Sequence, residues 1–353
     1  MKWVRGKRLG HGSFATVSLA VPTSQSSIYP PLMAVKSCGA FFSSSLVTEK
    51  LILEELKGCP EIIRCFGDSV SCENGEKLYN VLLEYASGGN LADKVKDSGG
   101  EGLPEFEVQR YTKALLRGLN YIHKSGYVHC DVKLQNILMC GDGGPKIADF
   151  GLARRAGLKS AVSGTPMYMS PEMVVGGEQG TPADIWAMGC AVAEMAGGAP
   201  AWSGFSDVAA LVMRIGVGDQ VPEVPRNLSD EGKDFLGKCF VKDPNQRWTA
   251  EMLLNHPFIG CWDHDLDGED DDCVAASKAR QVNTTALTSP RCPFSFEDWV
   301  SCEITNSPSP VEFRQSGLWL SEEPAIGMAS RVSALKCEQA PDWSVSGDWV
   351  TIR

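Results

Sequence analysis

Residues 128–151 constrain this chain more tightly than any other stretch. They carry four side chains suited to phosphate or metal chemistry, namely Asp131, Lys133, Asn136 and Asp149. Apolar residues stand on both sides of the turn 141–144, with Ile137 and Leu138 before it and Ile147 after it. Turn residues between two apolar segments predict a β-hairpin-like reversal. We therefore expect two short strands, with a polar loop at each end of the pair.

Such a reversal brings Asp149 back beside Asn136. A carboxylate and an amide oxygen then converge on one point, which suits a hard, hydrated cation such as Mg²⁺. Asp131 is left on the other side of the turn as a candidate proton acceptor, and Lys133 can reach a phosphate. A metal clamp, a base and a lysine together predict phosphoryl transfer.

These residues resemble the protein kinase family. The family's catalytic loop, H-R-D-x-K-x-x-N, is similar to His129-Cys130-Asp131-Val132-Lys133-Leu134-Gln135-Asn136, and its metal loop, D-F-G, to Asp149-Phe150-Gly151. The resemblance implies an α+β fold of two lobes that uses ATP and Mg²⁺. It places a β-rich N-lobe at residues 3–83, a hinge at 84–87 and a helical C-lobe at 88–259. The acidic composition and the Ser and Pro residues of 260–353 predict a largely disordered tail after it.

A glycine-rich turn lies near the start of the chain, between two expected strands within residues 3–19. Its residues are Leu9, Gly10, His11, Gly12, Ser13, Phe14, Ala15, Thr16 and Val17. Small residues let backbone N–H groups approach phosphate oxygens closely. The turn resembles the kinase loop G-x-G-x-x-G-x-V, with Ala15 where the third glycine is usual. Taken alone, it also fits an ordinary glycine hairpin.

Lys36 ends an apolar strand at residues 33–36 and resembles the lysine of the kinase motif V-A-I-K. Its implied partner is Glu49, on the helix expected at residues 45–56, chosen by comparison with the family pattern E-x-x-I-L. A solvated strand lysine and a surface helix charge are the alternatives for these two residues.

The resemblance also implies an adenine site. The strand expected at 79–85 leads into a hinge that includes Glu84 and Ala86, whose backbone hydrogen-bonds adenine in kinases, and Leu83 would be the gatekeeper. Leu9, Val17 and Ala34 would cover the base from above, and Leu138 would lie below it. Simple core packing of these apolar residues is compatible with that role.

Apolar residues at helical spacing predict a long buried helix over residues 106–123: Val108, Tyr111, Leu115, Leu119 and Ile122. The family pattern implies an activation segment at 149–172, which contains Ser160, Ser163 and Thr165. The pairing of Lys133 with Thr165 resembles that of Ser/Thr kinases, and this resemblance implies an aliphatic hydroxyl rather than a tyrosine as the phosphate acceptor. Asp184 is implied to hold the catalytic-loop backbone, and Arg247 to pair with Glu172.

Cys130 is the main departure from the family, because most kinases have an arginine there that pairs with a phosphorylated activation loop. A thiol cannot supply that positive charge. Our hypothesis is that activation-loop phosphate is not obligatory here and that control comes from abundance or from the tail. An inert packed thiol and a redox switch are the two roles open to Cys130.

Charge and cysteine usage exclude several classes of protein. The net charge is −11, of which the tail from residue 260 carries −9, with seven Lys and Arg against sixteen Asp and Glu. An acidic chain without a basic stripe argues against a nucleic-acid partner. We find no signal peptide, and no apolar run near the roughly 18 residues that span a bilayer, so we expect no membrane insertion. The 13 cysteines include no Cys-x-x-Cys pair and are expected to be reduced thiols of a cytoplasmic protein, with the nucleus as a second compartment.

The tail carries two weak metal patterns. Residues 263–272 imitate the start of an EF-hand, but Val274 stands where the closing glutamate is needed, so a solvated acidic linker is the default. A zinc site of Cys261, His264 and Cys273 lacks a fourth ligand. Segments 294–300 and 348–352 alternate apolar with polar or acidic residues. We expect them to be either docking motifs or strands that pack against the kinase domain.

A closer resemblance is to the plant mitogen-activated protein kinase kinase kinases of the MEKK-like class. It rests on the opening residues 3–6, on His129-Cys130-Asp131-Val132-Lys133, on Gly164-Thr165-Pro166 and on the closing residues 348–353. It implies a MAP kinase kinase as substrate, in stress or hormone signalling such as abscisic acid signalling, and regulators that dock on the tail. A Ser/Thr kinase outside this cascade and a pseudokinase scaffold are the alternatives.

Overall fold

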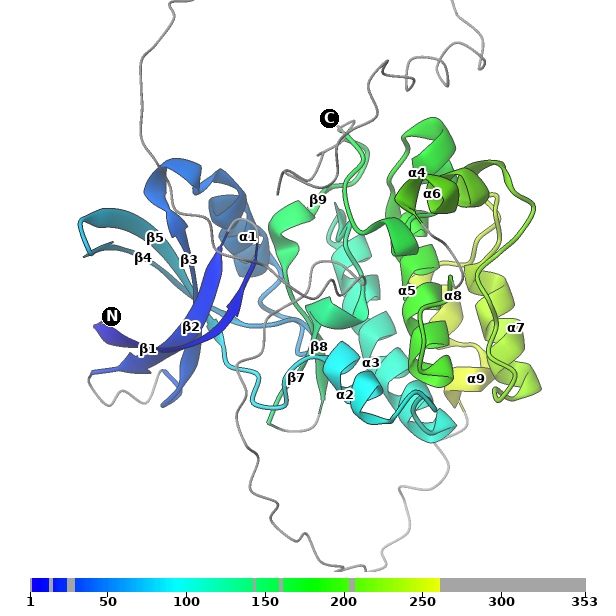
Figure 1. Ribbon diagram of the computed structural model, residues 1–353, viewed down its shortest axis with the longest axis horizontal. Helices are drawn as coiled ribbons and strands as arrows, with labels where there is room; N and C mark the ends of the chain where they lie inside the picture. The colour runs from blue at the N-terminus through cyan, green and yellow to red at the C-terminus, as the bar shows by residue number, and fades with distance from the viewer. Residues whose placement is uncertain are drawn as a thin grey trace, which may run out of the picture. The chain divides into compact units, whose positions relative to one another are not determined.

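The computed structural model describes residues 2–12, 15–23, 29–141, 144–158, 161–202 and 207–260 (Figure 1). Ser13, Phe14 and Ser160 lie outside the described residues. The predictions made for the tail also lie outside them: the EF-hand-like segment, the candidate zinc ligands and the two alternating segments.

The first part of the chain forms a five-stranded antiparallel sheet with the order β1-β2-β3-β5-β4. The strands are β1 (Trp3–His11), β2 (Thr16–Pro22), β3 (Met33–Gly39), β4 (Cys65–Glu73) and β5 (Glu76–Glu84). The expected strands around the glycine-rich turn and at 33–36 are confirmed. The strand expected at 79–85 begins earlier, at Glu76, because the polar residues at its start pair with the end of β4 across a tight turn.

The two faces of the sheet pack against different cores. Met33 and Val35 of β3 form a small cluster with Ala20 and Leu82, whereas Ala34 belongs to the main core of the molecule. Side chains alternate along a strand. Alternation therefore directs Lys36 to the same face as Ala34, the face that meets helix α1 (Ser44–Glu55).

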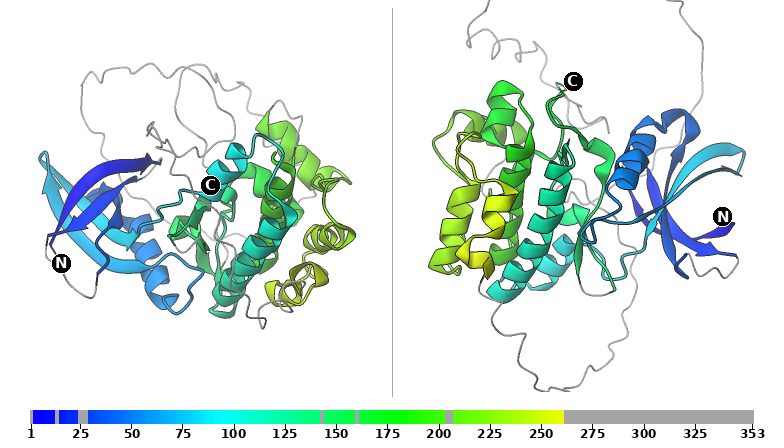
Figure 2. Two further views of the ribbon diagram at one scale, coloured as in Figure 1. Left: turned by 90° about the horizontal axis from the view of Figure 1, so that it is seen from below. Right: turned by 180° about the vertical axis from the view of Figure 1, so that it is seen from behind.

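The second part is mainly helical (Figures 1 and 2). Its helices are α2 (Leu91–Asp97), α3 (Glu105–Lys124), α4 (Pro171–Gly176), α5 (Thr181–Gly197), α6 (Val208–Val217), α7 (Asp230–Cys239), α8 (Ala250–Leu254) and α9 (Pro257–Gly260). Its short strands are β6 (Tyr127–Val128), β7 (Ile137–Met139), β8 (Pro145–Ile147) and β9 (Arg154–Arg155), which pair as β6 with β9 and β7 with β8. A sheet-rich lobe and a helical lobe confirm the predicted α+β kinase fold.

Helices α3 and α5 form the centre of the helical lobe. The five residues of α3 predicted to be buried, from Val108 to Ile122, are all buried, and the helix extends one residue beyond the predicted range at each end. Helix α5 is buried on nearly all sides, as expected of a helix that is apolar all round. Together they form a rigid base for the loop that follows β6.

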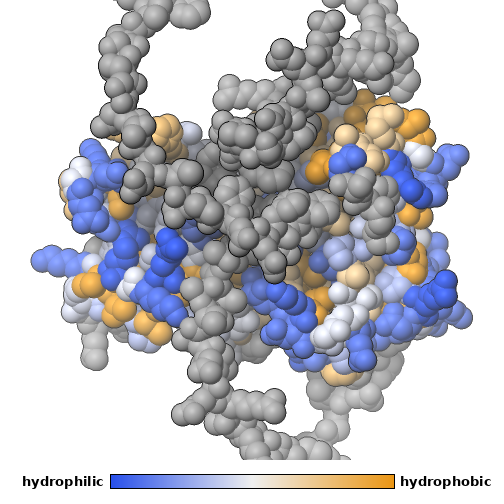
Figure 3. Space-filling view, in the orientation of Figure 1, coloured by the Kyte–Doolittle hydropathy of each residue, from blue (hydrophilic) through white to orange (hydrophobic). Residues whose placement is uncertain are grey.

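The described residues include exposed apolar side chains and free cysteines. Apolar side chains gather at the upper right of Figure 3, where Figure 1 places α4 and α6; the exposed ones include Val175, Met213 and Val217. The eight cysteines of the described residues are all free, and six of them are buried. Within the same residues, no helix has both the length and the apolar character needed to span a bilayer.

Candidate active site

Three charged side chains from separate elements meet between the sheet and the helical lobe. Lys36 Nζ lies 2.6 Å from Glu49 Oε2 on α1 and 2.8 Å from Asp149 Oδ1, which follows β8. The Glu49 side chain is only 2% exposed. The predicted pairing of Lys36 with Glu49 is confirmed, so the readings of a solvated lysine and a surface glutamate are wrong.

The charge of Lys36 is fixed by these two carboxylates. Burial alone would lower its pKa, but the negative charges of Glu49 and Asp149 and their hydrogen bonds outweigh it and raise the pKa above the usual value. Lys36 therefore stays positively charged on the face of the sheet that meets α1. A fixed cation in this place can hold phosphate oxygens.

The backbone around Asp149 aims its carboxylate at Lys36. Asp149 has a left-handed conformation (φ 61°), which aspartate tolerates better than most residues. The next residue, Phe150, is fully buried and packs edge-on against His129, with ring centroids 4.8 Å apart. Ser45 of α1 donates a hydrogen bond to the carbonyl of Gly151 at 3.0 Å. Helix α1 is thus connected to this loop directly by Ser45 and indirectly by Glu49, which shares Lys36 with Asp149.

A second polar cluster forms around Asp131. Its carboxylate accepts hydrogen bonds from the Asn136 amide (2.9 Å) and the Thr165 hydroxyl (2.9 Å), and it pairs with Lys133 Nζ (2.8 Å). Lys133 Nζ also donates to the Thr165 hydroxyl at 2.8 Å. The predicted pairing of Lys133 with Thr165 is confirmed. An aliphatic hydroxyl thus already sits against this carboxylate and this ammonium group.

Asp184 of α5 holds the loop that carries Asp131. Its carboxylate accepts the backbone N–H groups of His129 (2.8 Å) and Cys130 (3.0 Å) and contacts His123 Nε2 at 2.9 Å. Burial acts to raise the pKa of Asp184, but the hydrogen bond and charge of His123 and the contacts with His129 lower it on balance. The structural role predicted for Asp184 is confirmed.

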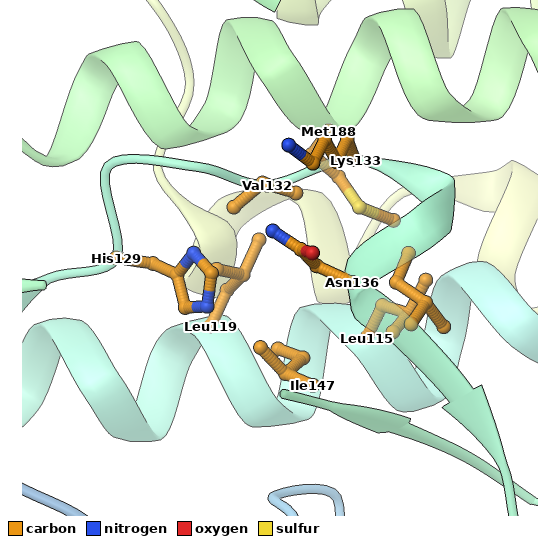
Figure 4. A pocket seen from close by; sticks show the side chains of 9 residues that line it. Leu115, Leu119, His129, Val132, Lys133, Asn136, Ile147 and Met188 are labelled. Carbon is orange, nitrogen blue, oxygen red and sulfur yellow. The ribbon is translucent and has the colours of Figure 1, made fainter. Parts of the chain in front are cut away.

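The predicted reversal between β7 and β8 is also confirmed. The backbone N–H of Ala148 donates to the carbonyl of Asn136 at 2.9 Å, which returns the chain to the side of the catalytic loop just before Asp149. Behind this point, Figure 4 shows a small cavity lined from α3 by Leu115 and Leu119 and from α5 by Met188. Apolar side chains from the two helices therefore pack around the polar loop, with α5 on one side of it and α3 on the other (Figure 4).

The donor set of Asn136 and Asp149 fits a magnesium ion. The Asn136 amide nitrogen donates to the carboxylate and the carbonyl of Asp131, so its oxygen is the atom available as a ligand. The Asp149 carboxylate is 26% exposed and carries a formal negative charge. Hard oxygen donors of this kind are typical of Mg²⁺ sites, which usually keep several waters. His, Cys, Asp and Glu form no metal-binding cluster of three or more in the described residues.

The glycine-rich turn joins β1 to β2, and the apolar residues predicted to bind adenine lie in or beside the main core. The N–H of Gly12 donates to the carbonyl of Ala15 at 2.9 Å, which closes the turn between β1 and β2. His11 is exposed and lies 3.0 Å from the Thr16 hydroxyl, and Gly10 pairs with Val17. Ala34 and Leu83 are part of the main core, and the following are half-buried against it: Leu9, Ala15, Val17, Ala86 and Leu138. Apolar groups that are neither exposed nor fully packed suit a flat apolar ring.

Glu84, predicted in the hinge, also links the two lobes by its side chain. It is the last residue of β5, and its carboxylate pairs with Lys146 of β8 at 2.7 Å. Its backbone N–H donates to the carbonyl of Arg64 at 2.8 Å. The start of the hinge is therefore held by Arg64 on the sheet side and by Lys146 on the helical-lobe side.

The predicted ion pair of Arg247 with Glu172 is confirmed and buried. The two contacts are 2.6 Å and 2.9 Å, and the Arg247 side chain is fully shielded from solvent. This pair fixes the end of the activation segment against the helical lobe. Its role is structural, as predicted.

Sequence reasoning missed two residues that organise the site. Ser45 ties α1 to the loop after Asp149, and Gln179 joins the catalytic loop to the activation segment. Neither belongs to a motif quoted above. Their contacts span 106 and 49 residues of sequence, so no local pattern could have revealed them.

Comparison with known proteins gives consistent results. Residues 3–259 match the family model described as the protein kinase domain. Mitogen-activated protein kinase kinase kinase 20 of Arabidopsis thaliana is 48% identical over 365 aligned residues that cover 100% of both chains. Mitogen-activated protein kinase kinase kinases 18 and 17 of the same plant are 38% and 37% identical over 100% of this chain, and 99% and 93% of their own lengths. The similarity therefore extends beyond residue 260.

Proposed function

The chain belongs to the protein kinase family, as a Ser/Thr kinase of the mitogen-activated protein kinase kinase kinase type, and on that premise we propose that its substrates are MAP kinase kinases. The observation that carries the catalytic part is the pair of polar clusters: Lys36 with Glu49 and Asp149, and Asp131 with Lys133. One cluster suits the nucleotide phosphates and the other suits an acceptor hydroxyl.

The catalytic roles follow from charge and position. ATP would supply the transferable phosphoryl group, and a bound magnesium ion would neutralise much of the phosphate charge. Lys36 would hold the non-transferred phosphates, and Glu49 fixes the position of Lys36. Asn136 and Asp149 would hold the metal. These residues position and stabilise charge, which is most of what phosphoryl transfer requires of a protein.

Asp131 and Lys133 act on the acceptor side. The serine or threonine hydroxyl of the substrate gives its proton to the Asp131 carboxylate while its oxygen forms the new bond to phosphorus and ADP leaves. Lys133 neutralises charge on the transferred group. The contact of the Thr165 hydroxyl with both side chains supports this assignment, because it is a protein hydroxyl in the same chemical setting.

The substrate class rests on the relatives. Three proteins named as mitogen-activated protein kinase kinase kinases align with the whole chain, so a MAP kinase kinase is the natural acceptor to test. From the same resemblance we also propose a role in stress or hormone signalling, such as abscisic acid signalling, with the cytoplasm as the expected compartment and the nucleus as a second one.

A panel of purified, catalytically dead MAP kinase kinases with radiolabelled ATP tests this proposal. We expect phosphate on activation-loop serine or threonine of at least one of them, located by mass spectrometry, and none with the Lys36→Met variant. Labelling of a generic peptide without any panel member would place the kinase outside this cascade. If the protein bound ATP but transferred phosphate to no acceptor, the pseudokinase scaffold would be the remaining interpretation.

A further inference from the structure

The side chain of Gln179 lies where three functional segments meet. It stands between α4 and α5 and is only 9% exposed. Its amide nitrogen donates to the carbonyl of Cys130 at 3.2 Å and to the carbonyl of Ser163 at 2.8 Å. Its amide oxygen accepts from the backbone N–H of Ser163 at 3.3 Å and from Arg154 Nη2 at 3.2 Å. Two donors and two acceptor positions are thus all occupied.

These contacts reach the catalytic residues in one further step. Cys130 directly precedes Asp131, and Ser163 precedes Thr165 by two residues. Between them, Gly164 (φ 124°) passes so close to Cys130 that a Cβ would lie 2.7 Å from its carbonyl oxygen. Only glycine fits this conformation and this space. Gln179 therefore holds the catalytic loop and the activation segment in contact.

Arg154 takes part in the same set of hydrogen bonds. Its guanidinium donates to neutral acceptors: the carbonyls of Ala161 (3.4 Å) and Gln179 (3.0 Å) and the Gln179 amide oxygen. Lys36 is already paired with Glu49, and Thr165 already contacts Asp131. The three contacts of Arg154 are thus made with neutral oxygens, which supports an arrangement that does not depend on a negative charge.

We propose that Gln179 is a positioning residue that sets the active arrangement of the catalytic loop and activation segment through neutral hydrogen bonds, without a phosphate on the segment. This inference rests on the proposed kinase activity. It deepens the assignment by stating what takes the place of a phosphate bound to an arginine. Gln179 touches no reacting group and acts through Asp131 and Thr165.

Replacing Gln179 by glutamate is the sharpest test, because a carboxylate has the same shape but donates no hydrogen bond. We expect a roughly tenfold to thirtyfold fall in kcat at pH 8, since two hydrogen bonds of about fivefold each are lost. The KM for ATP should stay unchanged, because Lys36 and Asp149 keep their partners. A protonated carboxyl regains one donor, so the activity of Gln179→Glu relative to wild type should recover as the pH falls.

Two controls separate positioning from a general loss of structure. Gln179→Leu cannot regain a donor and should be impaired at every pH. Gln220→Glu makes the same charge change at an exposed position and should match the wild type. Hydrogen–deuterium exchange should rise at residues 161–169 and 129–133 in both Gln179 variants and not in Gln220→Glu. Wild-type enzyme stripped of phosphate, as verified by intact mass, should keep its kcat within about twofold.

Either of two results would overturn the inference: Gln179 variants with wild-type kcat and exchange, or a phosphate-free wild type that is inactive until the segment is phosphorylated. A wild type that transfers phosphate to no acceptor would instead refute the proposed function. The exchange measurement would still decide whether Gln179 joins the two segments.

Discussion

Replacing Glu49 by glutamine tests the central ion pair of the site. Glutamine keeps the size of the side chain and one acceptor for Lys36, but it removes the charge. A hydrogen bond to a charged group is worth about 1.5–3 kcal/mol, roughly twice a neutral one. The substitution should therefore remove about 1–1.5 kcal/mol of positioning energy at the 2.6 Å contact with Lys36, which is a roughly fivefold to fifteenfold fall in rate.

Glu49→Ala removes the whole contact and should cost more. Asp149 remains 2.8 Å from Lys36, so the ammonium group keeps one counter-charge and swings toward the metal ligand. We expect a loss of roughly 30-fold to 150-fold, the equivalent of about 2–3 kcal/mol. Because Lys36 acts on the phosphates during transfer, the loss should fall mainly on kcat rather than on the KM for ATP.

Steady-state kinetics with a peptide acceptor measures both parameters. The matched control is Glu54→Gln on the same helix: Glu54 is 47% exposed and pairs with Lys50 at 2.9 Å, four residues earlier. Exposed helix pairs contribute only about 0.3–0.5 kcal/mol, so this variant should stay within about twofold of the wild type. Equal kinetics for Glu49→Gln and Glu54→Gln would refute the role given to the pair.

Three further predictions address the rest of the molecule. Burial raises the pKa of the Cys130 thiol, so iodoacetamide at pH 8 should modify the exposed Cys72 well before Cys130, as followed by peptide mass mapping. Rapid modification of Cys130 would instead favour the redox-switch hypothesis. Asp184→Asn should lower the melting temperature at pH 7. Because the folded-state pKa of Asp184 is lowered, its contribution to folding stability is present above about pH 4 and is lost as the pH falls through the folded pKa. The melting temperature of the variant should therefore fall less steeply with decreasing pH than that of the wild type, and an equal dependence on pH would contradict this. Deletion of residues 261–353 should leave a soluble, ATP-binding domain with a cooperative melt, and insolubility of that fragment would mean that the tail belongs to the core.

Local patterns predicted much of the fold and of the site. The helical spacing from Val108 to Ile122 predicted α3, because a buried face repeats every three to four residues whatever the helix packs against. The turn at 141–144 predicted the β7–β8 hairpin, because glycine-rich turns fix strand direction locally. The roles of Lys36 and Glu49 came from the family pattern, and the structure supplied their contact.

Other features depend on packing between distant segments and could not be predicted. The left-handed conformation of Cys130 occurs at a residue type that usually avoids positive φ, whereas Asp149 belongs to a type that tolerates it better. In both cases the surrounding contacts, not the local sequence, impose the conformation. The bridge made by Gln179 joins residues 16, 25 and 49 positions away. A glutamine between two helices carries no signal of its own, because the same residue is usually solvated.

Cys130 and Gln179 are best understood as two parts of one arrangement. An arginine at position 130 would place a second guanidinium near Arg154, which already donates to three neutral oxygens. Two like charges in a partly buried region destabilise each other unless an anion lies between them. A buried thiol with its sulfur 3.6 Å from the Val128 carbonyl adds no charge, and the Gln179 amide satisfies the Cys130 carbonyl without one. In the proposed arrangement, the neutral thiol of Cys130 and the neutral Gln179 bridge hold the two segments together without a phosphate on the activation segment.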